Sequence, residues 1–208
     1  KVNNNFSDIL TERSILYPNK VFCHKINGRE ITFLELEQYV NRCCRFYEEI
    51  GVVSNDVVTI SIPNSISFII FYIAGIRSGI KVNPCPSTLS EYELVKNINF
   101  VESRLLITHK LIDVDRIPSN CLSFKFNNDD DLLLKLEPYT DQKYEREIYS
   151  HDIACIYYSS GTTGNPKCVL YSHKNMLSLT KSIVNDFQFL PESIHLGILP
   201  LGHTAITN

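Results

Sequence analysis

The chain has 208 residues, of which 44% are hydrophobic and 21% are charged. This composition is typical of a globular protein, and it excludes a disordered or collagen-like chain. Lys and Arg together number 20, and Asp and Glu together number 23, so the formal net charge of -3 gives no excess of positive charge for binding a nucleic acid or an anionic membrane.

Short apolar runs alternate with amphipathic stretches along the first half of the chain. The apolar runs hold few polar residues, which is typical of strands in a sheet covered on both faces. Two capping boxes, Thr32-Phe33-Leu34-Glu35 and Thr88-Leu89-Ser90-Glu91, mark helix starts. The pattern predicts a strand at 21–26, a turn at 27–28, a helix from Thr32 to about Ile50, a strand at 57–61, a helix from Pro63 to about Gly79, a strand at 80–83, a helix from Thr88 to about Asn99 and a strand at 105–108. This alternation predicts an α/β fold with layered, largely parallel sheets and flanking helices.

The segment 110–150 has a less regular pattern. It holds an acidic run at 127–131 and a stretch rich in charge and tyrosine at 139–150. We interpret it as a solvated connecting region rather than an acidic binding site. The chain then divides into a first α/β portion at 1–109, this connecting region, and a last portion at 151–208.

The seven cysteines predict buried thiols. Their number is odd, no pair has the Cys-x-x-Cys spacing, and most lie within apolar runs, so neither a disulfide framework nor a zinc site is expected. These thiols and the absence of a signal peptide in the polar first residues predict a cytoplasmic protein. The longest apolar stretch, 66–76, is too short for a membrane span.

A hydroxyl-rich loop between two predicted strands, 153–158 and 168–171, is the segment most suggestive of chemistry. It reads Ser159-Ser160-Gly161-Thr162-Thr163-Gly164-Asn165-Pro166-Lys167. Glycine lets backbone N–H groups approach an anion, hydroxyls donate to phosphate oxygens, and lysine adds positive charge. The spacing is neither a Walker A loop nor Gly-x-Gly-x-x-Gly. The composition indicates a polyphosphate site, with a hydroxyl-rich surface hairpin as the alternative.

The run from Tyr158 to Lys167 resembles the signature loop of the adenylate-forming superfamily, which includes acyl-CoA synthetases and peptide-synthetase adenylation domains. The form of this loop and Asn83-Pro84 favour the acyl-CoA synthetase and 4-coumarate–CoA ligase branch. The resemblance extends over most of the chain, through Thr32 to Leu36, Asn55 to Val58, Ile62 to Ser65, Ala74 to Gly79, Asp152, Ser172 to Met176 and Leu199 to His203.

The resemblance implies an enzyme that activates a carboxylic acid with ATP. The acid attacks the α-phosphorus, pyrophosphate leaves, and the thiol of CoA or of a carrier protein then attacks the acyl-adenylate. His203 matches a position near the acid carboxylate, with a core or strand-end histidine as the alternative, whereas His173 is expected to cap or pack. The residues implied to bind the ATP phosphates are Ser159, Ser160, Gly161, Thr162, Thr163, Gly164 and Lys167.

Two residues depart from the family pattern. Cys168 stands where the family usually has Gly, and a thiol beside a cationic loop could have a lowered pKa; we interpret it as a tolerated substitution. Gly202 replaces a bulky aromatic residue, which leaves the wall of the acid pocket undefined.

The resemblance also implies that several motifs of the family lie beyond Asn208. These motifs include the ligand of Mg²⁺ and the catalytic Lys, so no catalytic or metal-binding residue is assigned here. We therefore expect an N-terminal fragment that is inactive alone. The alternatives are an acyl-AMP ligase, an adenylation domain that loads a carrier protein, and a non-catalytic module that binds a nucleotide or a partner.

Overall fold

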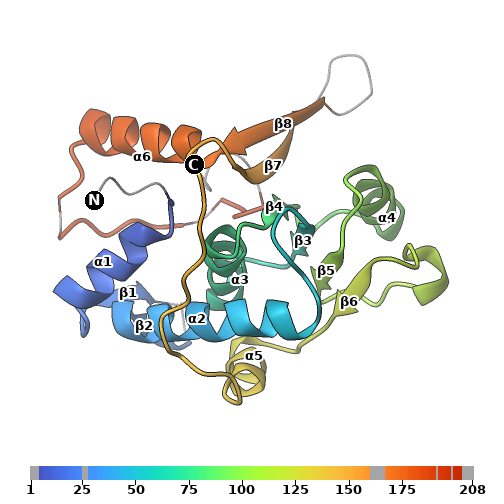
Figure 1. The fold of residues 1–208 in the computed structure, drawn as a ribbon, viewed down its shortest axis with the longest axis horizontal. Helices are drawn as coiled ribbons and strands as arrows, with labels where there is room; N and C mark the ends of the chain where they lie inside the picture. Colours follow the sequence, from blue (N-terminus) through green and yellow to red (C-terminus); the bar gives the residue numbers. More distant parts are fainter. Residues whose placement is uncertain (1–4, 25–27, 160–166, 191, 198, 203–208) are drawn as a thin grey trace.

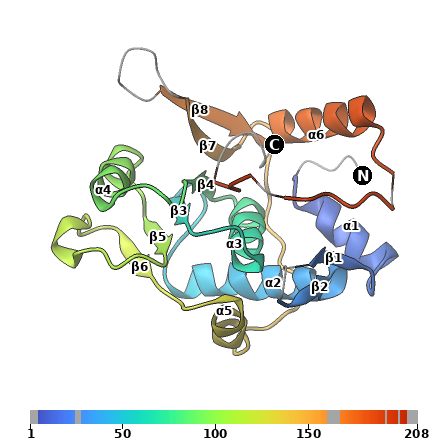
Figure 2. The same ribbon diagram turned by 180° about the vertical axis from the view of Figure 1, so that it is seen from behind.

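The computed structural model describes residues 5–24, 28–159, 167–190, 192–197 and 199–202. They form a six-stranded sheet flanked by helices and a separate two-stranded sheet (Figures 1 and 2). In chain order the elements are α1 (Asp8–Leu16), β1 (Val21–His24), β2 (Glu30–Thr32), α2 (Phe33–Glu49), β3 (Val57–Ser61), α3 (Ile66–Arg77), β4 (Lys81–Pro84), α4 (Glu91–Phe100), β5 (Leu105–Thr108), the 3-10 helix η1 (Val114–Arg116), β6 (Leu122–Phe124), α5 (Asp129–Leu136), β7 (Ile153–Ser159), β8 (Lys167–Ser172) and α6 (His173–Phe187).

The six-stranded sheet is largely parallel, as the alternating pattern predicts. Its strand order is β6-β5-β3-β4-β7-β8. Strand β3 pairs in parallel with β4 and β5, β6 joins β5, and β7 joins β4, whereas β8 alone runs antiparallel to its neighbour β7. Every residue of β3 and β5 is buried, which confirms a sheet covered on both faces.

Two hydrophobic cores cover the opposite faces of this sheet. Leu105 and Ile107 of β5 belong to the large core beneath α2, α3 and α5, and Leu106 between them belongs to the smaller core beneath α4. Because successive side chains of a strand point to opposite faces, α3 and α4 lie on opposite sides of the sheet (Figure 1). The connections that follow the adjacent strands β3 and β4 therefore leave in opposite directions. Open α/β sheets bind ligands at the carboxyl ends of strands that diverge in this way.

Helix starts and ends are set by local sequence. At α2 the predicted capping box is confirmed, because Glu35 N–H donates to Thr32 Oγ1 at 3.2 Å and Thr32 N–H donates to the Glu35 carboxylate at 2.9 Å. At α4 the predicted box is wrong. Leu89 N–H donates to Pro86 O in a preceding turn, so the helix begins later, with Ser90 as its N-cap.

Regular structure within 110–150 corrects our interpretation of that segment as irregular. Strand β6 extends the sheet, and α5 packs against α2 and α3. The acidic run is the start of α5, where acidic side chains favour the positive end of the helix dipole. Asp129 is buried and accepts hydrogen bonds from the backbone N–H and the hydroxyl of Ser67, at 3.0 and 2.6 Å.

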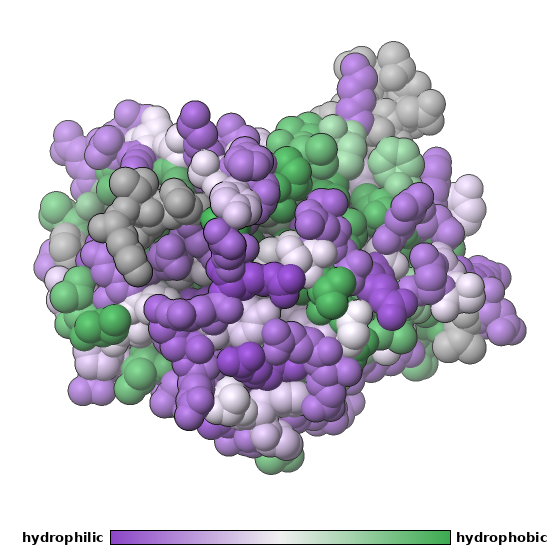
Figure 3. Space-filling model, in the orientation of Figure 1, coloured by the Kyte–Doolittle hydropathy of each residue, from purple (hydrophilic) through white to green (hydrophobic). Residues whose placement is uncertain are grey.

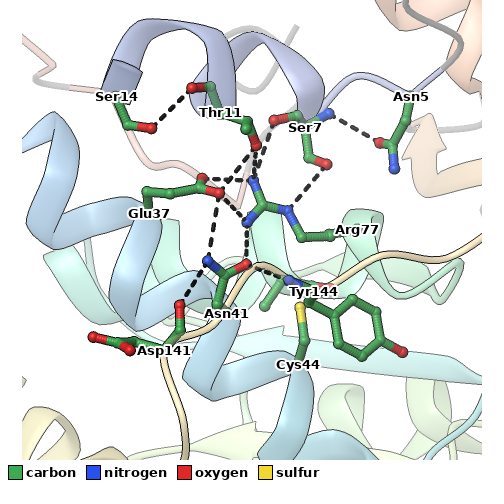
Figure 4. Close-up of polar contacts among 11 residues, drawn as sticks. Asn5, Ser7, Thr11, Ser14, Glu37, Asn41, Cys44, Arg77, Asp141 and Tyr144 are labelled. Atoms are coloured by element: carbon green, nitrogen blue, oxygen red, sulfur yellow. Dashed lines mark hydrogen bonds and ion pairs between the residues drawn. The ribbon is translucent and has the colours of Figure 1, made fainter. Parts of the chain in front are cut away.

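A buried ion pair joins three helices (Figure 4). The Arg77 guanidinium in α3 donates to both carboxylate oxygens of Glu37 in α2, at 2.7 and 2.9 Å, and to Asn41 Oδ1 at 2.7 Å. It also donates to the backbone O of Ser7 and to the hydroxyl of Thr11 in α1. These hydrogen bonds and the ion pair offset the free-energy cost of removing the charged guanidinium from water.

The surface around β7 and β8 is hydrophobic (Figure 3). Val169 and Leu170 of β8 are 39% and 55% exposed, and within the described residues β8 has no strand on its outer side. No helix among the described residues has the length and apolar character that a membrane crossing requires.

Candidate functional site

The hydroxyl-rich loop is anchored by the β7–β8 hairpin. Strand β7 ends at Ser159 and β8 begins at Lys167, and these two residues are paired across the hairpin. Both ends of the loop therefore lie together, at the carboxyl end of β7. A strand follows the loop rather than a helix, which separates it from a Walker A loop. Ser160, Gly161, Thr162, Thr163 and Gly164 lie outside the described residues.

The carboxyl edge of the sheet gives this hairpin its surroundings. Because β7 is parallel to β4, and β4 to β3, the hairpin loop leaves the sheet at the same edge as the turns that follow β3 and β4. This is the edge where the helical connections diverge. Both ends of the predicted phosphate loop thus lie at the edge where α/β sheets bind ligands.

A buried pair of tyrosines anchors strand β7 in the core. The hydroxyls of Tyr157 and Tyr72 lie 2.9 Å apart, and the Cys155 thiol donates to the Tyr72 hydroxyl at 3.2 Å. Burial raises the pKa of Cys155 to about 12 and the pKa of Tyr72 well above its usual value. These groups are therefore neutral, and they act as hydrogen-bonding anchors of the strand. No sequence motif indicates this pair, because the two tyrosines lie 85 positions apart.

Cys168 corrects one expectation. It lies on β8 opposite Tyr158. The residue is exposed, but partial burial of its thiol raises the pKa instead of lowering it. A raised pKa keeps the thiol protonated at neutral pH, so it is a weak nucleophile. The structure thus agrees with the interpretation of a tolerated substitution.

Helix α6 follows the hairpin and is held against the start of β7. Ser172 caps it, and His173 N–H donates to Asp152 O at 3.1 Å. The His173 ring is fully buried, and its Nδ1 accepts a hydrogen bond from Phe6 N–H at 3.4 Å. Burial lowers the pKa of His173 to about 4, so the ring is neutral. The predicted packing role of His173 is confirmed.

The segment before His203 also reaches the carboxyl edge. Leu201 N–H donates to Asn64 Oδ1 at 2.7 Å, in the turn that follows β3. Gly202 is buried, and a methyl group built on it would overlap the carbonyl group of Cys85 and lie 2.9 Å from Pro86 N. This contact gives a physical reason for glycine in place of an aromatic residue. His203 itself lies outside the described residues.

Comparison with known proteins relates the chain to a family of enzymes. A family model described as AMP-binding enzyme matches residues 10–207. The chain is 25% identical over 202 residues to 4-coumarate–CoA ligase 1 of Petroselinum crispum, covering 87% of this chain and 36% of that protein. It is 29% identical over 182 residues to peroxisomal OPC-8:0-CoA ligase 1 of Arabidopsis thaliana, covering 80% of this chain and 32% of that protein.

A solved structure agrees with the fold. The crystal structure of ATP-bound MatB from Rhodopseudomonas palustris superimposes with a TM-score of 0.85 at 22% identity, covering 98% of this chain and 41% of that one. The chain spans about a third of the length of the two curated relatives. The family match and the shared fold together show that the chain belongs to the AMP-binding enzyme family.

Proposed function

We propose that this chain is the N-terminal part of an ATP-dependent carboxylic acid–CoA ligase. The observation that carries the proposal is the hairpin pairing of Ser159 with Lys167 at the carboxyl edge of the sheet. It supports a ligand site at this edge, because both ends of the loop lie where the connections of the sheet diverge. The two CoA ligases among the relatives support the choice of this branch.

The proposed role of the loop is electrostatic. When the acid attacks the α-phosphorus of ATP, negative charge grows on the leaving pyrophosphate, and fixed donors at that place lower the barrier. We assign this role to Lys167 and to the loop residues Ser159, Ser160, Gly161, Thr162, Thr163 and Gly164. His203 is proposed to lie beside the acid carboxylate.

Mg²⁺ and CoA are proposed as cofactor and co-substrate. When bound, Mg²⁺ would neutralise phosphate charge. The described residues hold no group of three or more His, Cys, Asp or Glu side chains that fits a metal ion, and we assign no step to the metal. The acid, the thiol acceptor and a cytoplasmic location stay predictions.

The test is carboxylate-dependent ATP–pyrophosphate exchange by the full-length gene product. A panel of short, long and aromatic acids would be offered, with this chain assayed alongside. We expect exchange with one class of acid by the full-length protein, and none by this chain. A folded full-length protein that exchanges with no acid would contradict the proposal.

The thiol acceptor needs a second assay, because exchange reports only the adenylation step. Thioester formation would be measured with CoA and with a phosphopantetheinyl carrier protein. We expect product with CoA. Product with the carrier protein alone would favour the alternative of an adenylation domain that loads a carrier.

A further inference from the structure

The Asn64 side chain joins the turn after β3 to a segment far along the chain. Its Oδ1 accepts from Leu201 N–H at 2.7 Å, and its Nδ2 donates to Leu199 O at 2.8 Å and to Gly197 O at 3.4 Å. All three bonds go to the backbone of this one segment. Only a side chain with both a donor and an acceptor can make them, so an amide is well suited to this position.

The turn after β4 contacts the end of the same segment. Gly202 packs so closely on Cys85 and Pro86 that a side chain there would overlap them. This turn is itself fixed to the end of β3, because Cys85 N–H donates to Ile60 O at 2.8 Å and the Ser61 hydroxyl donates to Pro86 O at 3.2 Å. Residues 199–202 are therefore held between the turns that follow the two strands whose connections diverge.

We propose that Asn64 is a positioning residue for binding of the carboxylic acid. It fixes the backbone of residue 197 and of residues 199–202, which directly precede His203, the residue proposed to bind the acid. This inference rests on the proposed function. Asn64 itself is exposed, and its bonds are made at the surface, so its loss removes the alignment of the segment without opening a cavity in the core.

Two substitutions test the role in the full-length gene product. Asn64→Ala removes all three bonds. Asn64→Asp keeps an acceptor for Leu201 N–H but places a carboxylate oxygen against the carbonyl of Leu199. The matched control is Ser65→Ala, because the Ser65 hydroxyl caps α3 by accepting from Phe68 N–H at 3.1 Å and, within the described residues, makes no hydrogen bond to 197 or 199–202.

Two readouts separate positioning from simple loss of stability. In ATP–pyrophosphate exchange, Asn64→Ala should raise KM for the acid roughly tenfold while KM for ATP stays near the wild-type value. Asn64→Asp should give a smaller rise. Hydrogen exchange of the Leu201 amide should become faster in Asn64→Ala. Ser65→Ala should change neither the acid KM nor the Leu201 exchange rate.

The outcomes are distinct. An unchanged acid KM in an active Asn64→Ala enzyme, or an equal rise in Ser65→Ala, would overturn the positioning role. If the wild-type protein exchanges with no acid, the proposed function fails instead. In that case hydrogen exchange still tests whether Asn64 holds the segment. Unaltered protection of the Leu201 amide in Asn64→Ala would show that it does not.

Discussion

Lys167 and Cys168 are neighbours on β8, but only Lys167 is proposed to take part in catalysis. Lys167 pairs with Ser159 at the mouth of the hairpin, where the loop leaves the sheet. Cys168 is one step further from the loop, and burial raises the pKa of its thiol. A change at the first should therefore affect catalysis, whereas a change at the second should have little effect.

Replacement of Lys167 by Ala should slow adenylation by the full-length protein. In the proposed mechanism this lysine supplies positive charge where negative charge grows on the leaving pyrophosphate, so we expect a loss of roughly a hundredfold in kcat. ATP–pyrophosphate exchange measures it. Lys174→Ala, in the first turn of α6, is the control for loss of a lysine. Unchanged kinetics in Lys167→Ala would remove Lys167 from the site.

Cys168 should react slowly with alkylating reagents at neutral pH. Since the thiolate is the nucleophile and the pKa is raised, the alkylation rate should increase only as the pH becomes alkaline. Mass spectrometry of the alkylated peptide against pH measures this.

Cys168→Gly should keep exchange activity within about twofold, at a cost in stability of up to about 1 kcal/mol. Rapid alkylation at pH 7 would contradict a protonated Cys168 thiol, and an inactive Cys168→Gly protein would contradict the interpretation of a tolerated substitution.

At the scale of elements, the ion pair between Arg77 and Glu37 ties α3 to α2, and its other bonds reach α1. The two side chains are 4% and 9% exposed. A buried charge that loses its partner is far more costly than an exposed one. The packing of these three helices therefore depends on both members of the pair.

Arg77→Met should destabilise the protein by about 3–5 kcal/mol, because it leaves the Glu37 carboxylate buried without its partner. Urea unfolding measures the loss. The double variant Arg77→Met/Glu37→Leu should recover most of it. Lys143→Met, which breaks the exposed pair with Glu145, should cost less than about 1 kcal/mol. A double variant no more stable than Arg77→Met would contradict this account.

The elements also show which parts of the fold can be predicted from sequence. Strands β3 and β5 have the predicted bounds, because burial on both faces requires continuous apolar runs. Strand β6 has two exposed residues and no such run, and α5 opens with acidic residues that are typical of a solvated loop. The buried role of Asp129 depends on its contact with Ser67, 62 positions away. No local pattern reports that contact.

In the candidate site, too, local features can be predicted from the sequence and long-range contacts cannot. The strands on either side of the hydroxyl-rich loop are local features, so the sequence predicts both of them. Asn64 lies in a block whose sequence indicates only the start of a helix. Its bond to Leu201 spans 137 positions and can be found only in the folded chain.

At the scale of the whole molecule, His173 connects the start of α6 to the N-terminal segment. Its ring accepts from Phe6 N–H across 167 positions of sequence. Burial lowers the pKa of the ring from 6.5 to about 4. Charging this histidine therefore opposes the folded state.

Stability should fall as the pH falls from about 6.5 through about 4. In this window the unfolded chain binds a proton at His173 and the folded chain does not, so unfolding takes up protons; the loss is about 2–4 kcal/mol when complete. Urea unfolding at several pH values measures it. His173→Gln should flatten the slope, and His151→Gln, at a side chain that is 82% exposed, should leave it unchanged. Equal slopes in His173→Gln and the wild type would contradict this role.

The bond between Asn64 and Leu201 also has a consequence for the order of folding. During synthesis the strands β3, β4 and β5 leave the ribosome well before residues 197–202 do, and contacts of such high sequence separation form slowly. We expect the sheet to assemble first, and residues 197 and 199–202 to join its carboxyl edge afterwards. A nascent chain stopped before residue 197 should therefore already protect β3 and β5 from hydrogen exchange.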